Sequence, residues 1–78
     1  MPMFCKMDIF KVTERRGGCI YKTKKVAYHW FPVGKSPDIN SWLSPEIAQQ
    51  NNLPPGEYLY CATLEYVTDC RIPAGGMY

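Results

Sequence analysis

Hydrophobic and polar residues alternate along two runs of the chain between Phe4 and Phe31, and the runs meet at Arg15-Arg16-Gly17-Gly18. Alternation with a period of two is typical of a β-strand that buries one face. A Gly-Gly pair between two such runs favours a two-residue hairpin turn, because both glycines accept a positive φ. The sequence therefore predicts one long β-hairpin from Phe4 to Phe31.

The predicted turn also sets the register of this hairpin. Residues at equal distance from Gly17-Gly18 lie opposite each other and share a face of the ribbon. Nearer the turn, Lys11 then meets Lys24, and like charges in opposition destabilise a strand pair. On the other face, His29 meets Lys6. Three pairs form the predicted core face: Cys5 with Trp30, Met7 with Tyr28, and Ile9 with Val26.

Positive charge gathers toward the turn. Residues 1–25 contain seven Lys or Arg residues against two acids, whereas residues 26–78 contain two against five. Two explanations fit this pattern: long lysines keep a protruding hairpin from pairing through its edges, or the turn end is a basic finger for an anionic partner. Under the second explanation, seven residues form the candidate partner-binding site: Lys11, Arg15, Arg16, Tyr21, Lys22, Lys24 and Lys25.

Two helix-start signatures follow the hairpin, Ser36-Pro37-Asp38 and Ser44-Pro45-Glu46. Each places a capping hydroxyl, a first-turn proline and an acid in order. The first predicts a short turn, and the second predicts a helix from Pro45 to about Gln50. We expect the Trp42-Leu43 pair to anchor this segment on the sheet.

A third strand is predicted from Glu57 to Val67, and its residues are largely apolar on both faces. Such a strand is usually central in its sheet or lies at an interface. We place it against one strand of the hairpin, with the helix covering one face of the sheet. The tail over residues 68–78, which contains Pro73 and Gly75-Gly76, is expected to be irregular.

These elements indicate an α+β fold in a single domain over residues 1–78. A small antiparallel sheet of three strands is built on the hairpin and carries one short helix, in the order β-β-α-β. A chain of 78 residues buries only a small core. Because the third strand is also apolar on both faces, we expect a homodimer.

The sequence gives little indication of catalysis, a metal or a cofactor. His29 is the only histidine, and no nucleophile or acid near it in sequence completes a catalytic arrangement. The four cysteines form no Cys-x-x-Cys pair, so we expect no metal site. No apolar run resembles a signal peptide or a membrane span, which predicts a cytoplasmic protein with reduced thiols.

A glycine-tipped basic hairpin, followed by Pro55-Gly56-Glu57-Tyr58 at the start of an alternating strand, is similar to the small single-stranded-DNA-binding proteins of filamentous phages. That resemblance implies a dimeric five-stranded barrel. The helix-like segment 44–52 and the absence of a final strand depart from it, so no family is assigned. Gly75-Gly76 also looks like the tail of ubiquitin-like modifiers. Too few residues follow Gly56 for that fold, and a flexible tail explains the glycines more simply.

We therefore expect a non-enzymatic binding protein, an inhibitor or adaptor of the kind that phages encode against host machinery. Its basic hairpin would contact an acidic surface of a protein or nucleoprotein complex, and six tyrosines in so short a chain fit a binding face. The alternative is a single-stranded nucleic-acid-binding protein that uses basic and aromatic residues of the same hairpin. The formal net charge of +2 is low for a phosphate-driven binder, which favours the protein target.

Overall fold

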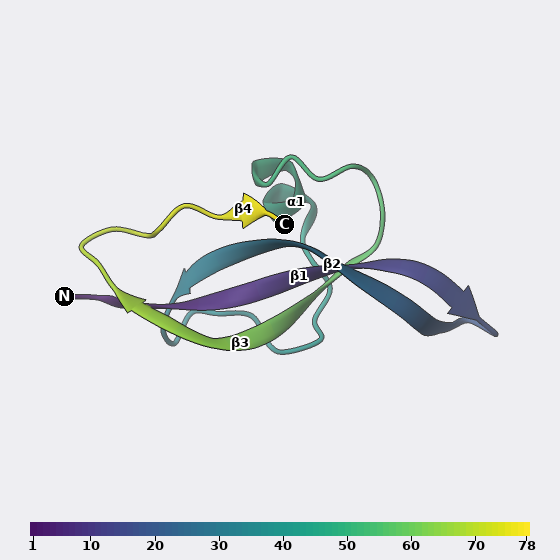
Figure 1. Ribbon diagram of the computed structural model, residues 1–78, viewed down its shortest axis with the longest axis horizontal. Helices are drawn as coiled ribbons and strands as arrows, with labels where there is room; N and C mark the ends of the chain where they lie inside the picture. The colour runs from purple at the N-terminus through teal and green to yellow at the C-terminus, as the bar shows by residue number, and fades with distance from the viewer.

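The predicted hairpin forms the centre of the sheet. The computed structural model describes residues 1–78, and Figure 1 shows the arrangement of its elements. The strands pair antiparallel in the order β3-β1-β2-β4, which makes the protein largely sheet with one short helix. The elements are β1 (Met3–Arg16), β2 (Cys19–Pro32), α1 (Pro45–Gln50), β3 (Tyr58–Thr68) and β4 (Gly76–Met77).

The turn between β1 and β2 has the predicted two-residue form. Arg16 pairs with Cys19, which leaves Gly17 and Gly18 as the turn residues. Their φ angles are 59° and 83°, and a type I′ turn requires a positive φ at both central positions. The prediction of a long hairpin with a glycine turn is confirmed.

The predicted register is correct for most pairs near the turn, where only Lys22 is displaced and pairs with Glu14, but it is wrong at the base of the hairpin. Ile9 pairs with Ala27 while Phe10 pairs with Lys25, so Val26 is the extra residue of a β-bulge in β2. A one-residue slip moves every following side chain to the other face of the sheet. The true cross-strand pairs at the base are Cys5 with Phe31, Lys6 with Trp30, Met7 with His29, and Asp8 with Tyr28.

This bulge changes which side chains form the core. Tyr28 and Trp30, predicted on the core face, lie instead opposite Asp8 and Lys6 on the other face. His29, predicted opposite Lys6, lies half-buried opposite Met7. The buried apolar cluster is Met7, Ile9, Ala27, Tyr58 and Tyr60.

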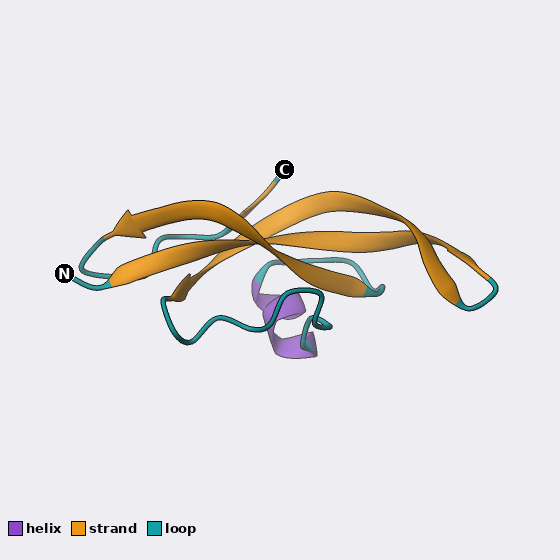
Figure 2. Ribbon diagram, turned by 90° about the horizontal axis from the view of Figure 1, so that it is seen from below, coloured by secondary structure: helices purple, strands orange, loops and turns teal.

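The helix begins and ends where the sequence predicted, and it covers one face of the sheet (Figure 2). The Ser44 hydroxyl accepts a hydrogen bond from the Ile47 backbone N–H at 3.4 Å, which is the interaction of an N-terminal cap. Ile47 packs against the core together with Leu43 and Leu53 from the flanking loops. Of the predicted anchor pair, Leu43 packs on the core, whereas Trp42 is 54% exposed.

β3 lies next to β1, as predicted, and at the edge of the sheet, so of the two alternatives for a strand that is apolar on both faces the central position does not apply. Only its first part is covered on the outer side, where the loop 40–43 exchanges backbone hydrogen bonds with Tyr58 and Tyr60. The remainder extends past this loop, and its Leu64 is 95% exposed. Apolar residues on both faces of this strand therefore reflect a buried start and an exposed end.

The tail is irregular over residues 69–75, and a short strand that the sequence did not predict follows at Gly76–Met77. β4 pairs with Ala27 and Tyr28 of β2 and adds a fourth strand, so the sheet differs from the five-stranded barrel implied by the phage-protein resemblance. Gly75 and Gly76 allow this pairing, because a Cβ on Gly75 would lie 2.7 Å from the Tyr28 carbonyl oxygen. The two glycines thus permit a close approach to β2, and a flexible tail is not needed to explain them. No helix in the structure has the length and apolar character needed to cross a membrane.

Candidate functional site

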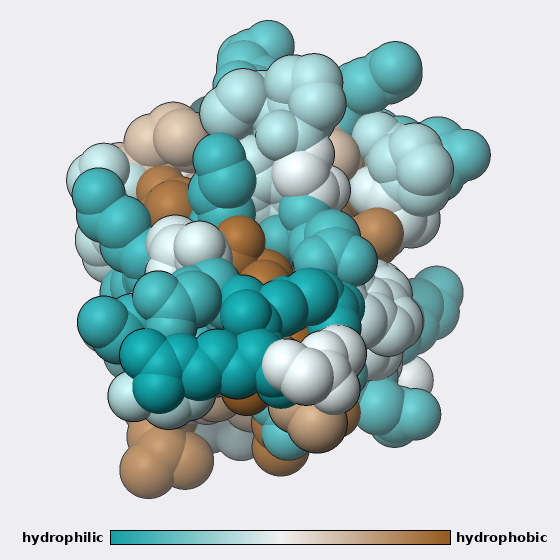
Figure 3. Space-filling view, turned by 90° about the vertical axis from the view of Figure 1, so that its right-hand side faces the viewer, coloured by the Kyte–Doolittle hydropathy of each residue, from teal (hydrophilic) through white to brown (hydrophobic).

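The turn end of the hairpin projects from the rest of the molecule. The protein measures 46 × 22 × 19 Å along its principal axes, and the hairpin extends past α1 along the longest one (Figure 1). β3 pairs with β1 only as far as Lys11, and beyond it the only backbone hydrogen bond of β1 outside the hairpin is from the Val12 N–H to the Glu57 carbonyl oxygen at 2.9 Å. Seen from the turn end, the surface is mainly hydrophilic, with apolar surface between the polar side chains and along the lower edge of the view (Figure 3).

Arg15 of the candidate site is held by an acid of the same chain. Its Nε and Nη2 donate to the two carboxylate oxygens of Glu57 at 2.8 and 3.1 Å, and Nη1 donates to the Gly18 carbonyl oxygen at 2.7 Å. This bidentate pair lowers the pKa of Glu57 and raises the pKa of Arg15. Arg15 therefore fastens the turn end to the loop that precedes β3.

Arg16 and Tyr21 contact each other at the turn. The Arg16 Nε lies 3.0 Å from a Glu14 carboxylate oxygen, and its guanidinium carbon lies 3.6 Å from the centroid of the Tyr21 ring. Glu14 pairs with Lys22 and Arg15 pairs with Ile20, so Tyr21 is the extra residue of a second bulge in β2. Its side chain is exposed. One face of this ring is already occupied by a cation.

Lys25 forms an ion pair with Asp8 of β1, which lies nearer the base of the hairpin. Its Nζ lies 3.4 Å from the Asp8 carboxylate and 5.3 Å from the centroid of the Tyr78 ring. Three of the six predicted cations, Arg15, Arg16 and Lys25, thus have acidic partners within the chain. Lys11, Lys22 and Lys24 have none.

A groove of about 440 Å³ begins where the core ends on the helix-covered face. The predicted opposition of Lys11 and Lys24 is confirmed, and both residues line this groove. Its other walls come from the loop before β3 and from β4. The remaining lining residues are Val12, Thr13, Val26, Leu53, Pro54, Tyr58 and Met77.

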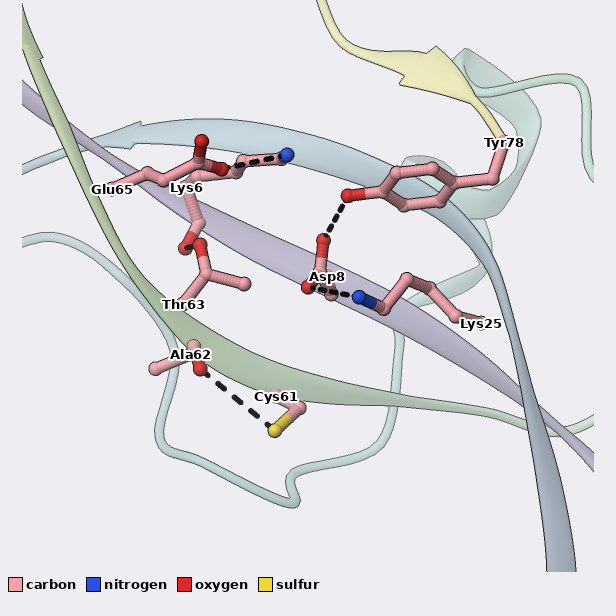
Figure 4. A network of polar contacts seen from close by, with 8 residues as sticks. All are labelled: Lys6, Asp8, Lys25, Cys61, Ala62, Thr63, Glu65 and Tyr78. Carbon is pink, nitrogen blue, oxygen red and sulfur yellow. Dashed lines mark hydrogen bonds and ion pairs between the residues drawn. The ribbon is translucent and has the colours of Figure 1, made fainter.

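Sequence reasoning missed a polar network on the opposite face of the sheet (Figure 4). The Asp8 side chain is buried, with 2% of the residue exposed, and the Tyr78 hydroxyl donates to its carboxylate at 2.5 Å. Beside it, Lys6 pairs with Glu65 at 2.8 Å and lies 4.7 Å from the Tyr28 ring centroid. The hydrogen bonds to Glu65 and Tyr78 raise the pKa of Lys6. The available signal was a lone acid, Asp8, inside a run of apolar alternation.

The side chains considered for catalysis or metal binding do not gather into a site. His29 contacts the Phe31 ring at a centroid distance of 4.8 Å, and its Nδ1 lies 3.4 Å from the Asn51 amide nitrogen. No three His, Cys, Asp or Glu side chains lie close enough together to hold a metal ion. Comparison of the chain with known protein families, with curated proteins and with solved structures finds no match.

Proposed function

We propose that this protein is a non-enzymatic binding protein, an inhibitor or adaptor that uses the turn end of its hairpin to contact an acidic surface of a protein partner. One observation carries the proposal: this end projects past the rest of the fold and holds three lysines, Lys11, Lys22 and Lys24, without an acidic partner. Unpaired charge of one sign on a protruding element attracts and orients a partner of the opposite sign.

The aromatic side chains favour a protein partner over single-stranded nucleic acid. A nucleic-acid groove presents several free rings on which successive bases stack. Here the Tyr28 ring packs against Tyr78 at 5.2 Å, and the Phe31 ring packs edge-on against Tyr60 at 5.7 Å. Two exposed rings lie near the turn end, Tyr21 and Trp42, and an arginine already covers a face of each: Arg16 lies 3.6 Å from the Tyr21 centroid and Arg15 lies 5.7 Å from the Trp42 centroid.

The test places a photoreactive benzoylphenylalanine at Tyr21 and cross-links the protein in cells of its source organism. We expect one defined protein with an acidic surface to be cross-linked, and we expect Lys22→Glu/Lys24→Glu to abolish the product. Lys35→Glu, an exposed lysine away from the turn, is the matched control and should leave the product unchanged.

A titration with oligonucleotides decides the nucleic-acid alternative. Fluorescence anisotropy with single-stranded and duplex oligonucleotides should show no binding at physiological salt if the partner is a protein. Tight binding whose affinity falls steeply with salt, by about one power for each phosphate contacted, would overturn the proposal in favour of nucleic acid.

We also propose that the exposed end of β3 pairs with β3 of a second copy. From Cys61 onward the outer edge of this strand makes no backbone hydrogen bond to any loop, and Leu64 and Tyr66 are exposed beside it. Its one charged residue, Glu65, is neutralised by Lys6, so the edge lacks the free charge that usually prevents pairing. Light scattering should show a dimer that Leu64→Lys converts to a monomer; a monomeric wild type at high concentration would refute this pairing.

A further inference from the structure

We propose that the groove beside Lys11 and Lys24 receives a segment of the protein partner in which carboxylate side chains stand next to large apolar side chains. This inference rests on the proposed function, because both lysines belong to the basic hairpin surface. It adds the chemistry of the partner: an acidic and apolar peptide, with acid at the rim of the groove and apolar side chains on its floor.

The shape of the groove fits an apolar side chain. Its volume of about 440 Å³ lies within the range of small-ligand sites, roughly 300–1,000 Å³. The apolar lining comes from four separate parts of the chain: Val26 of β2, Leu53 of the loop between α1 and β3, Tyr58 of β3 and Met77 of β4. Tyr58 is fixed in place because its hydroxyl donates to the Pro54 carbonyl oxygen at 2.5 Å. An apolar side chain that entered the groove would move out of water into contact with these apolar residues, which favours binding.

The charges at the rim are open to an acid from outside the chain. Lys11 and Lys24 are direct cross-strand neighbours, an arrangement that destabilises the strand pair, and neither forms an ion pair. The nearby acid Glu57 has both carboxylate oxygens bound by Arg15. A partner carboxylate would therefore neutralise two opposed charges that the fold itself leaves unmatched.

Because the groove combines lysines with an apolar floor, it fits a peptide better than a polyanion such as nucleic acid. A phosphate backbone would satisfy the lysines but would leave the walls formed by Val26, Leu53 and Met77 in contact with water or charge. Met77 is more than half exposed at the end of the groove, so it is available to pack against an incoming side chain. An alternating acidic and apolar peptide supplies both contacts at once.

The experiment titrates the full, isotope-labelled chain with blocked tetrapeptides and follows backbone amide and methionine methyl signals by NMR. Acetyl-Glu-Leu-Glu-Leu-amide should give saturable shifts at Val26, Leu53 and Met77. Acetyl-Gln-Leu-Gln-Leu-amide lacks the charge and acetyl-Glu-Ser-Glu-Ser-amide lacks the apolar side chains, so both should bind more weakly by at least about fivefold.

Two variants assign the contacts. Lys11→Gln/Lys24→Gln should weaken binding of the acidic peptide about fivefold, as expected for the loss of two ion pairs near the surface, while the control Lys35→Gln should not. Met77→Ser should weaken the same peptide without changing its salt dependence. The Lys11→Gln/Lys24→Gln protein relieves a like-charge contact and should fold, which its amide spectrum will show.

Equal binding of the charged and uncharged peptides, or no groove shifts at about 5 mM peptide, would overturn the proposal. Displacement of the peptide by an oligonucleotide at physiological salt would also overturn it. If the peptides fail while the cross-link from position 21 persists, the groove assignment is wrong and the proposed function stands. If the peptides bind while that cross-link is absent, the groove is supported and the proposed use of the turn end is wrong.

Discussion

The buried carboxylate of Asp8 provides the sharpest test of how this fold is held together. Tyr78→Phe removes one hydroxyl and keeps the ring that packs against Tyr28 at an interplanar angle of 56°. The lost hydroxyl donates to Asp8 at 2.5 Å in the wild type. Because Asp8 is only 2% exposed, water does not readily reach the carboxylate to replace this donor. A hydrogen bond to a charged group contributes about 1.5–3 kcal/mol, and we expect the free energy of unfolding to fall by about 2 kcal/mol.

Thermal and urea unfolding followed by circular dichroism measure this change. For a domain of this length, a loss of about 2 kcal/mol lowers the melting temperature by roughly 8–16 °C. Tyr66→Phe is the matched control, because Tyr66 is exposed and its hydroxyl makes no hydrogen bond within the chain, so its effect should stay within about 0.5 kcal/mol.

A double-mutant cycle with Asp8→Asn identifies the partner of the hydroxyl. The effects of Tyr78→Phe and Asp8→Asn should be non-additive, since both variants break the same contact. The reasoning is refuted if Tyr78→Phe behaves like Tyr66→Phe. Such a result would mean that Lys25, 3.4 Å from Asp8, satisfies this carboxylate without help from β4.

Three further predictions concern the rest of the fold. The pKa of Glu57 lies below its ordinary value of 4.5, so its pair with Arg15 stabilises the protein above that pH and is lost as the pH falls through the folded-state pKa. The acid unfolding curve of Glu57→Gln should therefore be flatter than that of the wild type. Burial raises the pKa of Tyr60 to about 12 from 10.0, so the neutral form stabilises the fold below pH 10 and stability falls as the pH rises toward 12. Tyr60→Phe should reduce that alkaline loss in unfolding measurements at high pH. Ser44→Ala removes the cap of α1 and should lower the free energy of unfolding by about 1 kcal/mol in urea titrations, whereas Ser36→Ala, which caps no helix, should have little effect.

Local signals predicted the elements of this protein well. The hairpin turn needed only the conformational freedom of Gly17-Gly18, and α1 needed only the order of Ser44, Pro45 and Glu46. Both features are decided within a few residues, because turn geometry and helix capping are short-range interactions. The bulge at Val26 has no such signal, because neither glycine nor proline marks it.

The missed contacts join residues that are far apart in sequence. Tyr78 and Asp8 are separated by 70 positions, and Arg15 and Glu57 by 42. Sequence patterns predicted that the hairpin would be basic, but not which of its cations the rest of the chain would neutralise. The two-residue strand β4 was likewise too short to produce an alternation, and only its pairing with β2 shows why two glycines precede Met77.

The bulge at Val26 also separates the structural and exposed parts of the hairpin. On the base side, Met7 and Ile9 build the core on one face while Asp8 binds Tyr78 on the other, so each face is committed to the fold. On the turn side, no apolar layer covers either strand, and Lys11 faces Lys24 without an acid between them. A like-charge pair of this kind does nothing for folding. The fold therefore tolerates Lys11 and Lys24 without using their charge, which leaves both lysines available for the partner contact proposed above.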